Sequence, residues 1–275
     1  MTHTAKTALI TGGAGGLGKA MAKALTADGF NTAIFDTNQG AASEVAGQIR
    51  EQSGTDCAIA IVGDVSDEKA CNDGVAKCID YFGSIDVLVN NAGIGVSSIR
   101  PDAERNHPSI EEIDRPLWDR FFAVNVTGPM LMVRAATPYM RANGWGRVIN
   151  NTTSFFTMLR VLPYGASKSA LESMSAIWAA ELENTGITVN VLVPGGPTDT
   201  PFVSDGAGIP RDKMLKPAIM GPPIRWLAST ASDGVTGQRF VAASWDSDTD
   251  DAQAAKNAGA PIGWPELGKA VVWPD

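Results

Sequence analysis

The sequence contains only two histidines, His3 and His107, and only three cysteines in 275 residues. The cysteines, Cys57, Cys71 and Cys78, form no CxxC spacing and have no histidine nearby, so the sequence predicts neither a disulfide framework nor a zinc site. A Ser-His-Asp triad would need a histidine base, and no serine lies in a GxSxG turn. These absences argue against a zinc enzyme and against a serine hydrolase.

Basic charge and long apolar runs are also scarce. Lysine and arginine number 22 against 30 acidic residues, which gives a net charge of -8, so nucleic acid and anionic membrane surfaces are repelled. Nowhere do about 18 apolar residues run unbroken, and the first residues hold too short an apolar run for a signal peptide. We therefore expect a cytoplasmic protein whose partners are small molecules rather than nucleic acid or a membrane.

What the sequence does contain is an alternation of short β-branched apolar runs with segments of helix length. The expected strands span residues 6–11, 31–36, 57–64, 85–90, 147–153, 187–193 and 239–242. The expected helices include residues 16–28, 39–52, 67–82 and 117–141. Apolar strands separated by helices predict a parallel sheet covered on both faces, and right-handed crossovers make it a doubly wound Rossmann fold of about seven strands.

The length and this rhythm predict one catalytic domain over residues 1–246. Residues 94–116 interrupt it with a loop rich in proline and charge, which is too long for an ordinary connection and is expected on the substrate side. Residues 247–275 form a C-terminal extension. Its tryptophans, Trp264 and Trp273, are expected to dock on this subunit or on a neighbouring one.

A glycine-rich turn, TGGAGGLG, lies between the first expected strand and the first expected helix, from Thr11 to Gly18. Glycines there let the backbone approach a pyrophosphate, whose charge is held at the helix N-terminus. Asp36 ends the second strand, where its carboxylate can accept hydrogen bonds from both ribose hydroxyls. A carboxylate repels a 2′-phosphate, and no arginine or lysine follows it closely, so NAD is favoured over NADP.

Taken in order, these motifs resemble those of the short-chain dehydrogenases/reductases of the compact, single-domain type. TGGAGGLG resembles the TGxxxGxG motif of that family, and YGASK, residues 164–168, resembles its YxxxK motif. Four further segments lie between them or follow them in the family's order, namely GDVSD at 63–67, NNAG at 90–93, VNVTG at 124–128 and PGGPTDT at 194–200. The likeness covers residues 6 to 243, and its weight comes from the order of the motifs.

The resemblance implies a set of cofactor-binding residues, with Asp64 and Val65 at the adenine and Asn90 beside the others on the cofactor floor. The PGGPTDT turn is about one residue longer than is usual, so Thr198 and Thr200 compete as the contact to the nicotinamide carboxamide. In chain order the implied set is Gly12, Gly16, Leu17, Gly18, Asp36, Asp64, Val65, Asn91, Ala92, Gly93, Tyr164, Lys168, Pro194, Gly195, Thr198 and Thr200.

Tyr164 and Lys168 lie four residues apart, so both can point into one cleft from the same helix face. A neighbouring ammonium and a cationic nicotinamide would lower the pKa of the tyrosine from about 10 by roughly 2 to 3 units. In the resulting hypothesis Tyr164 is the general acid/base and Ser154 orients the substrate oxygen. The resemblance implies in addition that Asn125 positions a water in a proton relay. The family usually carries a serine about a dozen residues before the tyrosine; Ser154 is our choice here, although the strand register alone favours Thr153.

These residues predict an NAD-dependent enzyme that transfers hydride between the carbinol carbon of a secondary alcohol and NAD. An NAD(P)H-dependent ketone or 3-oxoacyl reductase and a catalytically silent NAD-binding regulator are the alternatives. Family members commonly pair through the helix of the YxxxK motif, so we expect a homotetramer. Arg100, Arg105 and His107 in the 94–116 loop could recognise a polar group or belong to a solvated lid. Apolar residues expected on the substrate side favour an apolar or ring-bearing alcohol, namely Phe155, Phe156, Met158, Leu159, Leu162, Phe202, Met214 and Met220.

Overall fold

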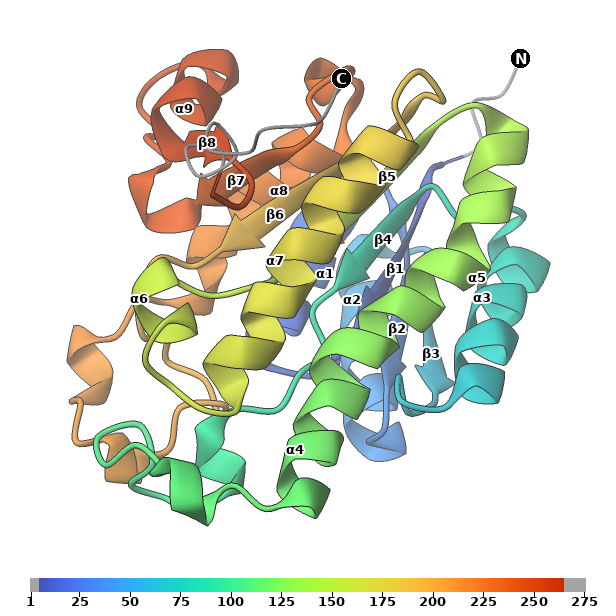
Figure 1. Ribbon diagram of the computed structural model, residues 1–275. Helices are drawn as coiled ribbons and strands as arrows, with labels where there is room; N and C mark the ends of the chain where they lie inside the picture. Colours follow the sequence, from blue (N-terminus) through green and yellow to red (C-terminus); the bar gives the residue numbers. More distant parts are fainter. Residues whose placement is uncertain (1–4, 265–275) are drawn as a thin grey trace, which may run out of the picture.

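Seven parallel strands and one antiparallel strand form a single sheet in the computed structural model, which describes residues 5–264 (Figure 1). Their order is β3-β2-β1-β4-β5-β6-β7-β8, and only β8 runs antiparallel to its neighbour. The doubly wound fold expected from the sequence is therefore confirmed. The strands are β1 Thr7–Thr11, β2 Asn31–Asp36, β3 Ala58–Val62, β4 Val87–Asn90, β5 Gly146–Asn150, β6 Ile187–Val193, β7 Gln238–Val241 and β8 Gly259–Pro261.

Helices cover both faces of this sheet, with α7 and α5 in front of it in Figure 1 and α1 and α8 behind. Along β1, Ala8 and Ile10 pack toward one face and Leu9 toward the other, which is why the strand is apolar throughout. One face is covered by α1 Gly16–Ala27, α2 Gln39–Ser53, α8 Gly221–Ala228 and α9 Asp251–Ala258. The other is covered by α3 Glu68–Phe82, α5 Gly128–Asn143 and α7 Tyr164–Glu181.

The strand order reverses between β1 and β4, and ligands of such sheets bind in the crevice outside the carboxyl ends of the strands at this point. The glycine-rich turn follows β1 and the NNAG segment follows β4. Residues 152–154, which include the candidate hydroxyls of Thr153 and Ser154, follow β5, and PGGPTDT follows β6. Three of the sequence motifs and the two candidate hydroxyls therefore meet at one edge of the sheet.

The prediction of one continuous helix over residues 117–141 is wrong. The segment begins earlier, as α4 Arg115–Phe122, widens into a π-helical turn over Ala123–Thr127, and continues as α5. Pro129 has no amide hydrogen to donate to the carbonyl of Asn125, which breaks the regular α-helical ladder at this point. The wide turn carries Asn125, one of the predicted site residues.

The described part of the C-terminal extension, residues 247–264, packs on its own chain. Helix α9 buries its alanines against the same cluster as α8, and β8 pairs with β7. The Trp264 ring lies 5.7 Å from the ring of Phe155, while Trp273 lies outside the described residues. Strand β8 brings the sheet to eight strands, one more than predicted. The sequence did not predict it because Gly-Ala-Pro contains none of the β-branched residues that are typical of strands.

Candidate active site

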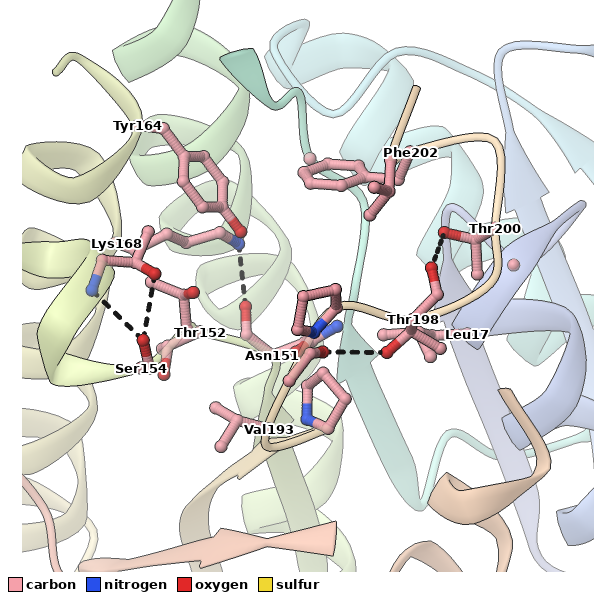
Figure 2. Close-up of a pocket in the computed structure, with 18 of the residues that line it drawn as sticks. Leu17, Asn151, Thr152, Ser154, Tyr164, Lys168, Val193, Thr198, Thr200 and Phe202 are labelled. Carbon is pink, nitrogen blue, oxygen red and sulfur yellow. Dashed lines mark hydrogen bonds between the residues drawn. The ribbon is translucent and has the colours of Figure 1, made fainter. Parts of the chain in front are cut away.

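A cleft of about 880 Å³ opens at the carboxyl edge of the sheet and gathers most of the predicted site residues. Figure 2 shows Tyr164 and Lys168 on one side of it, Leu17 and Thr200 on the other, and Asn151 between them. The predicted residues that line it are Gly12, Gly16, Leu17, Asp36, Asn91, Ala92, Gly93, Ser154, Tyr164, Lys168, Pro194, Gly195, Thr198 and Thr200.

Five predicted residues are not part of the cleft wall. The Asp64 carboxylate accepts hydrogen bonds from the amide and the hydroxyl of Ser66. Val65 packs against Gly128, since a Cβ on that glycine would lie 2.7 Å from the Val65 side chain. Asn90 is buried and donates to Asn150 at 2.9 Å. The remaining two lie directly behind the cleft wall, Gly18 against Gly12 and Asn91, and Asn125 against Gly93.

The glycine turn before α1 is shaped for the close approach of a ligand. Gly12 and Gly16 adopt φ values of 60° and 50°, which side-chain-bearing residues rarely adopt. A Cβ on Gly18 would lie 2.2 Å from the Gly12 carbonyl oxygen, so helix α1 packs tightly against the turn. By contrast, a Cβ on Gly15 would meet nothing within 4 Å. The open backbone at the α1 N-terminus fits a pyrophosphate, which the helix dipole attracts.

Asp36 and Asn91 position the two ends of this turn. The Asp36 carboxylate accepts from the amides of Ala14, at 3.1 Å, and Asn38, at 3.0 Å, which fixes it at the end of β2 beside the cleft. The Asn91 side-chain amide donates to the carbonyls of Thr11 and Gly12 at 3.0 and 3.1 Å. The segments that follow β1 and β4 are thereby joined into one surface.

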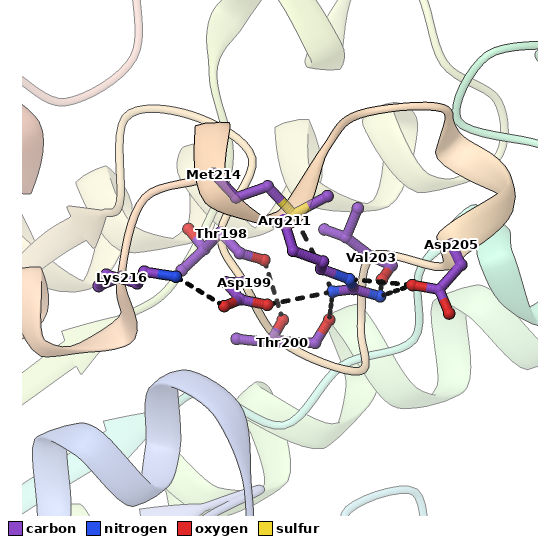
Figure 3. Close-up of polar contacts among 8 residues, drawn as sticks. All are labelled: Thr198, Asp199, Thr200, Val203, Asp205, Arg211, Met214 and Lys216. Carbon is purple, nitrogen blue, oxygen red and sulfur yellow. Dashed lines mark hydrogen bonds and ion pairs between the residues drawn. The ribbon is translucent and has the colours of Figure 1, made fainter.

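The segment after β6 forms the opposite wall and is held by charged side chains (Figure 3). Arg211 donates to the carbonyl oxygens of Thr200, at 3.0 Å, and Val203, at 2.8 Å, and pairs with Asp205 at 2.6 Å. Lys216 pairs with Asp199 at 2.9 Å. The segment that carries Thr198 and Thr200 is thus held in place by Arg211 and Lys216, which follow it by more than ten residues.

Tyr164 and Lys168 lie on one wall, with the lysine Nζ 5.9 Å from the centre of the tyrosine ring. Tyr164 opens only partly to the cleft, and burial raises its pKa to about 12, while interaction with the Thr153 side chain acts in the opposite direction. Burial lowers the pKa of Lys168 to about 8. Burial is thus the largest effect on the pKa of Tyr164 in the protein without a bound cofactor.

Asn125 is hydrogen-bonded to the backbone of Ile94, after β4, and to Ser167 on helix α7. Its Oδ1 accepts from the Ile94 amide at 2.9 Å, and its Nδ2 donates to the Ile94 carbonyl and to Ser167 Oγ, each at 3.0 Å. Gly93 lies next to it, since a Cβ there would be 3.1 Å from Asn125 Oδ1 and 3.5 Å from Lys168 Nζ. The π-helical turn thereby fixes the segment after β4 beside the lysine.

The predicted hydroxyl, Ser154, is placed differently from the role that we assigned to it. Ser154 is exposed and caps the short helix α6, Phe155–Met158, where its Oγ accepts from the Thr157 amide at 3.1 Å and contacts the Thr157 hydroxyl at 2.9 Å. Thr153 and Ser154 both line the cleft, and the Thr153 side chain acts to lower the pKa of Tyr164. Because Ser154 is engaged as a helix cap, Thr153 is the candidate we favour as the hydroxyl that assists the tyrosine.

Behind Thr153 lies a buried ion pair that the sequence did not reveal. Arg239 on β7 and Glu172 on α7 are 5% and 0% exposed, and their charged groups are 2.8 Å apart. Arg239 also donates to the Thr153 carbonyl oxygen, and the hydroxyl of Thr152 donates to Glu172 at 2.8 Å. The pair therefore fixes the backbone of the segment that presents the Thr153 hydroxyl.

Asn151 is a further site residue that sequence reasoning missed. Its carbonyl oxygen accepts from Lys168 Nζ at 2.8 Å, and its side-chain amide donates to Asn91 at 3.0 Å. Its own Oδ1 is buried and has no hydrogen-bond partner among residues 5–264, which leaves an acceptor for a ligand at the cleft. Its position directly after β5, at the edge where the motifs meet, is the signal that could have revealed it.

Within the described residues, no group of three or more histidine, cysteine, aspartate or glutamate side chains is arranged to hold a metal ion. None of the helices described in residues 5–264 is both long enough and apolar enough to span a membrane.

Comparison with known proteins gives consistent matches. A family model described as short chain dehydrogenase matches residues 6–206. The 2,5-dichloro-2,5-cyclohexadiene-1,4-diol dehydrogenase of Sphingobium indicum is 33% identical over 243 residues, which cover 84% of this chain and 92% of the relative. The sorbitol dehydrogenase of Cereibacter sphaeroides is 38% identical over 193 residues, which cover 69% of this chain and 70% of the relative.

A solved structure gives the same picture. The 3-ketoacyl-(acyl-carrier-protein) reductase of Brucella melitensis, complexed with NADH, superposes with a TM-score of 0.71 at 30% identity. The match covers 84% of this chain and 93% of that one.

Proposed function

Since the chain belongs to the short-chain dehydrogenase/reductase family of oxidoreductases, we propose that it oxidises a secondary alcohol to a ketone with NAD. The observation that carries the proposal is the meeting of Tyr164, Lys168 and the glycine turn around one cleft. The diol and sorbitol dehydrogenases named above act, by their names, on hydroxyl-bearing compounds. The substrate we propose is an apolar or ring-bearing secondary alcohol, because Phe156, Phe202 and Val161 line the cleft.

The choice of NAD rests on Asp36. Its carboxylate is fixed by two backbone amides beside the cleft, and it remains free to accept from ribose hydroxyls. A 2′-phosphate at the same position would meet a like charge, which disfavours NADP. The open turn at Gly15 and the α1 N-terminus would hold the pyrophosphate, and Asn151 Oδ1 would accept a donor from the bound molecule.

In the proposed reaction, bound NAD supplies the hydride acceptor, and the residues of the chain handle the proton and the orientation. The Thr153 hydroxyl holds the substrate oxygen, and Tyr164 takes the proton from that oxygen. Lys168, fixed by the Asn151 carbonyl at 2.8 Å, contributes a positive charge beside the tyrosine. That charge and the charge of the oxidised nicotinamide have to offset the burial that raises the pKa of Tyr164 to about 12.

Replacing Tyr164 with Phe tests the proposal. The variant should bind NAD with nearly the wild-type Kd, because the ring and its packing remain, while kcat falls by about 100-fold or more with loss of the acid/base. Calorimetry with NAD and with NADP, together with absorbance assays over a panel of secondary alcohols, measures both effects. A Phe variant that retained the wild-type kcat would contradict the role of Tyr164, and tighter binding of NADP than of NAD would contradict the role of Asp36.

The same residues serve the reverse reaction, so a ketone or 3-oxoacyl reductase is the second candidate. The Brucella melitensis relative is described as such a reductase, complexed with NADH. The net charge of -8 disfavours docking of an acidic carrier protein, which favours a free small molecule as the substrate. If the wild type turned over no alcohol and no ketone with either cofactor, a silent NAD-binding regulator would be supported instead.

We also propose that the chain assembles into a homotetramer. Ile177 on α7 and Tyr139 on α5 are 59% and 45% exposed, and the two helices are neighbours, because Arg141 and Glu181 approach within 3.8 Å. Large apolar side chains exposed on adjacent helices are typical of a subunit interface.

A further inference from the structure

The loop at residues 94–116 is built against the active site. Ala103 is fully buried in a small apolar cluster with Val96 and Val161, and the ring of Tyr164 packs against that cluster. The loop is therefore in direct contact with the residue that we propose as the acid/base.

Several contacts hold the loop in this position. Ser97 donates to the Phe202 carbonyl oxygen at 2.9 Å, and Ser204 donates to the Pro101 carbonyl oxygen. Arg100 donates to the Asn106 carbonyl oxygen at 2.8 Å, which closes the loop on itself. These contacts hold the first part of the loop against the cleft, whereas residues 109–112 are exposed.

Glu104 is the acidic residue of the loop that lines the cleft. The other carboxylates near it, Asp102 and Glu112, both contact Arg100. The Oε2 atom of Glu104, in contrast, is buried and has no hydrogen-bond partner within residues 5–264. A buried acceptor that no described protein group satisfies, facing a ligand cleft, is an arrangement that a ligand donor would complete.

The surroundings of Glu104 indicate what kind of donor fits. Val96, Val161, Phe156 and Phe202 line the same cleft, to which the loop also contributes His107, so much of the cleft lining is apolar. An ammonium would lose its hydration in such a place at high cost, whereas a hydroxyl is neutral and loses far less. A hydroxyl is therefore the better complement to this carboxylate.

We propose that Glu104 accepts a hydrogen bond from a second hydroxyl of the substrate, so that the substrate is a ring-bearing diol or polyol. This inference rests on the proposed function, because it takes the first hydroxyl to be the one that faces Tyr164. Glu104 then determines specificity without taking part in proton or hydride transfer. A substrate without the second hydroxyl leaves the carboxylate unpaired and is disfavoured.

The test compares cyclohexanol with trans-cyclohexane-1,2-diol in the wild type, Glu104→Leu and Glu104→Gln. The Leu variant should lose about 10- to 100-fold in kcat/KM for the diol and change little for cyclohexanol. The Gln variant should lose less, because its amide oxygen still accepts. Glu111→Gln is the matched control: Glu111 is an exposed carboxylate of the same loop, and its replacement should change neither substrate.

Two further measurements keep the outcome decisive. Calorimetry of the diol and cyclohexanol with NAD-saturated Tyr164→Phe, with and without Glu104→Leu, reads binding in the absence of turnover. Diol binding that depends on Glu104, together with a wild type that turns over neither compound, would overturn only the proposed reaction. Equal losses for both ligands, or tighter binding of trans-2-aminocyclohexanol than of the diol, would overturn the inference. Thermal unfolding should show the Leu variant at least as stable as the wild type, since an unpaired buried carboxylate is removed.

Discussion

Thr153 and Ser154 are adjacent residues whose hydroxyls serve different partners. Ser154 satisfies the Thr157 amide at the start of α6, as N-cap residues do, and lies exposed. Thr153 precedes the cap and lines the cleft, and its side chain acts to lower the pKa of Tyr164. Threonine supplies the same hydroxyl as the serine usual in the family, with one additional methyl group.

Exchanging these side chains separates the two roles. Thr153→Val keeps the shape but removes the hydroxyl, so kcat should fall by about 100-fold, whereas Thr153→Ser should retain most activity. Ser154→Ala should cost about 1 kcal/mol in the free energy of unfolding, as the loss of a helix cap does, and leave kcat within about threefold. Steady-state kinetics and urea unfolding measure both. The assignment would be reversed if the Ala variant lost turnover and the Val variant kept it.

At the residue scale, the sequence predicted the position of a site residue where that position follows from a fixed spacing within one helix or turn. Tyr164 and Lys168 share a helix face four residues apart, and Gly12 and Gly16 follow a strand end, so both pairs reach the cleft. Ser154 was chosen against the strand register, which alone favoured Thr153, and its role as the cap of α6 could not be predicted because Phe-Phe-Thr-Met does not signal a helix start. Glu104 lies in a loop without periodicity, where the sequence gives no direction for a side chain.

At the scale of elements, the Arg239–Glu172 ion pair joins β7, α7 and the segment after β5. It lies beside the C-terminal extension as well, since the Gly263 amide donates to Glu172 at 3.4 Å, and the Arg239 guanidinium stacks 4.4 Å from the centre of the Phe155 ring. A buried pair of this kind adds little to stability relative to apolar residues of the same size, but the loss of one partner leaves the other charge unpaired.

Glu172→Gln should therefore be strongly destabilising. We expect the free energy of unfolding to fall by about 3 kcal/mol, because the Arg239 charge would lose its buried partner. Kcat of the folded variant should fall as well, since Arg239 helps to fix the Thr153 backbone. Urea unfolding and kinetics below the transition measure the two effects.

Glu181→Gln on the same helix is the control. Glu181 is 65% exposed and lies 3.8 Å from Arg141, so its loss should cost less than about 1 kcal/mol. Equal effects of the two substitutions would show that burial of the pair is unimportant.

The helix break before α5 shows how element boundaries escape prediction. The apolar pattern of residues 117–141 is helical throughout, and it gave no sign of a wider turn. Pro129 was visible in the sequence and forbids one ladder bond, but a proline alone does not say whether a helix kinks, stops or widens. The contacts of Asn125 with Ile94 and Ser167 stabilise the wide turn, and these depend on distant parts of the chain.

At the scale of the whole molecule, the fold was predictable because the parallel strands are buried on both faces. Their apolar runs, such as residues 187–193, are uninterrupted and match the observed bounds of β6. The C-terminal extension was not predictable in the same way. Helix α9 and strand β8 are short, and they form by packing on α8 and by pairing with β7.

The proposed assembly is tested by mass. Light scattering at micromolar concentration should give a particle of four times the 28.8 kDa chain. Ile177→Asp places a charge on the exposed face of α7 and should yield smaller particles with unchanged far-ultraviolet circular dichroism. A wild-type monomer under these conditions would contradict the assembly.

Strand β8 also changes what the edge of the sheet offers to other chains. A parallel sheet that ended at β7 would expose unpaired amides and carbonyls, which recruit strands from misfolded or newly made copies. β8 covers that edge with only three residues, and its last residue, Pro261, has no amide hydrogen to offer a further strand. We therefore expect a chain shortened to residue 246 to aggregate more readily than the full chain, which light scattering of the two forms would measure.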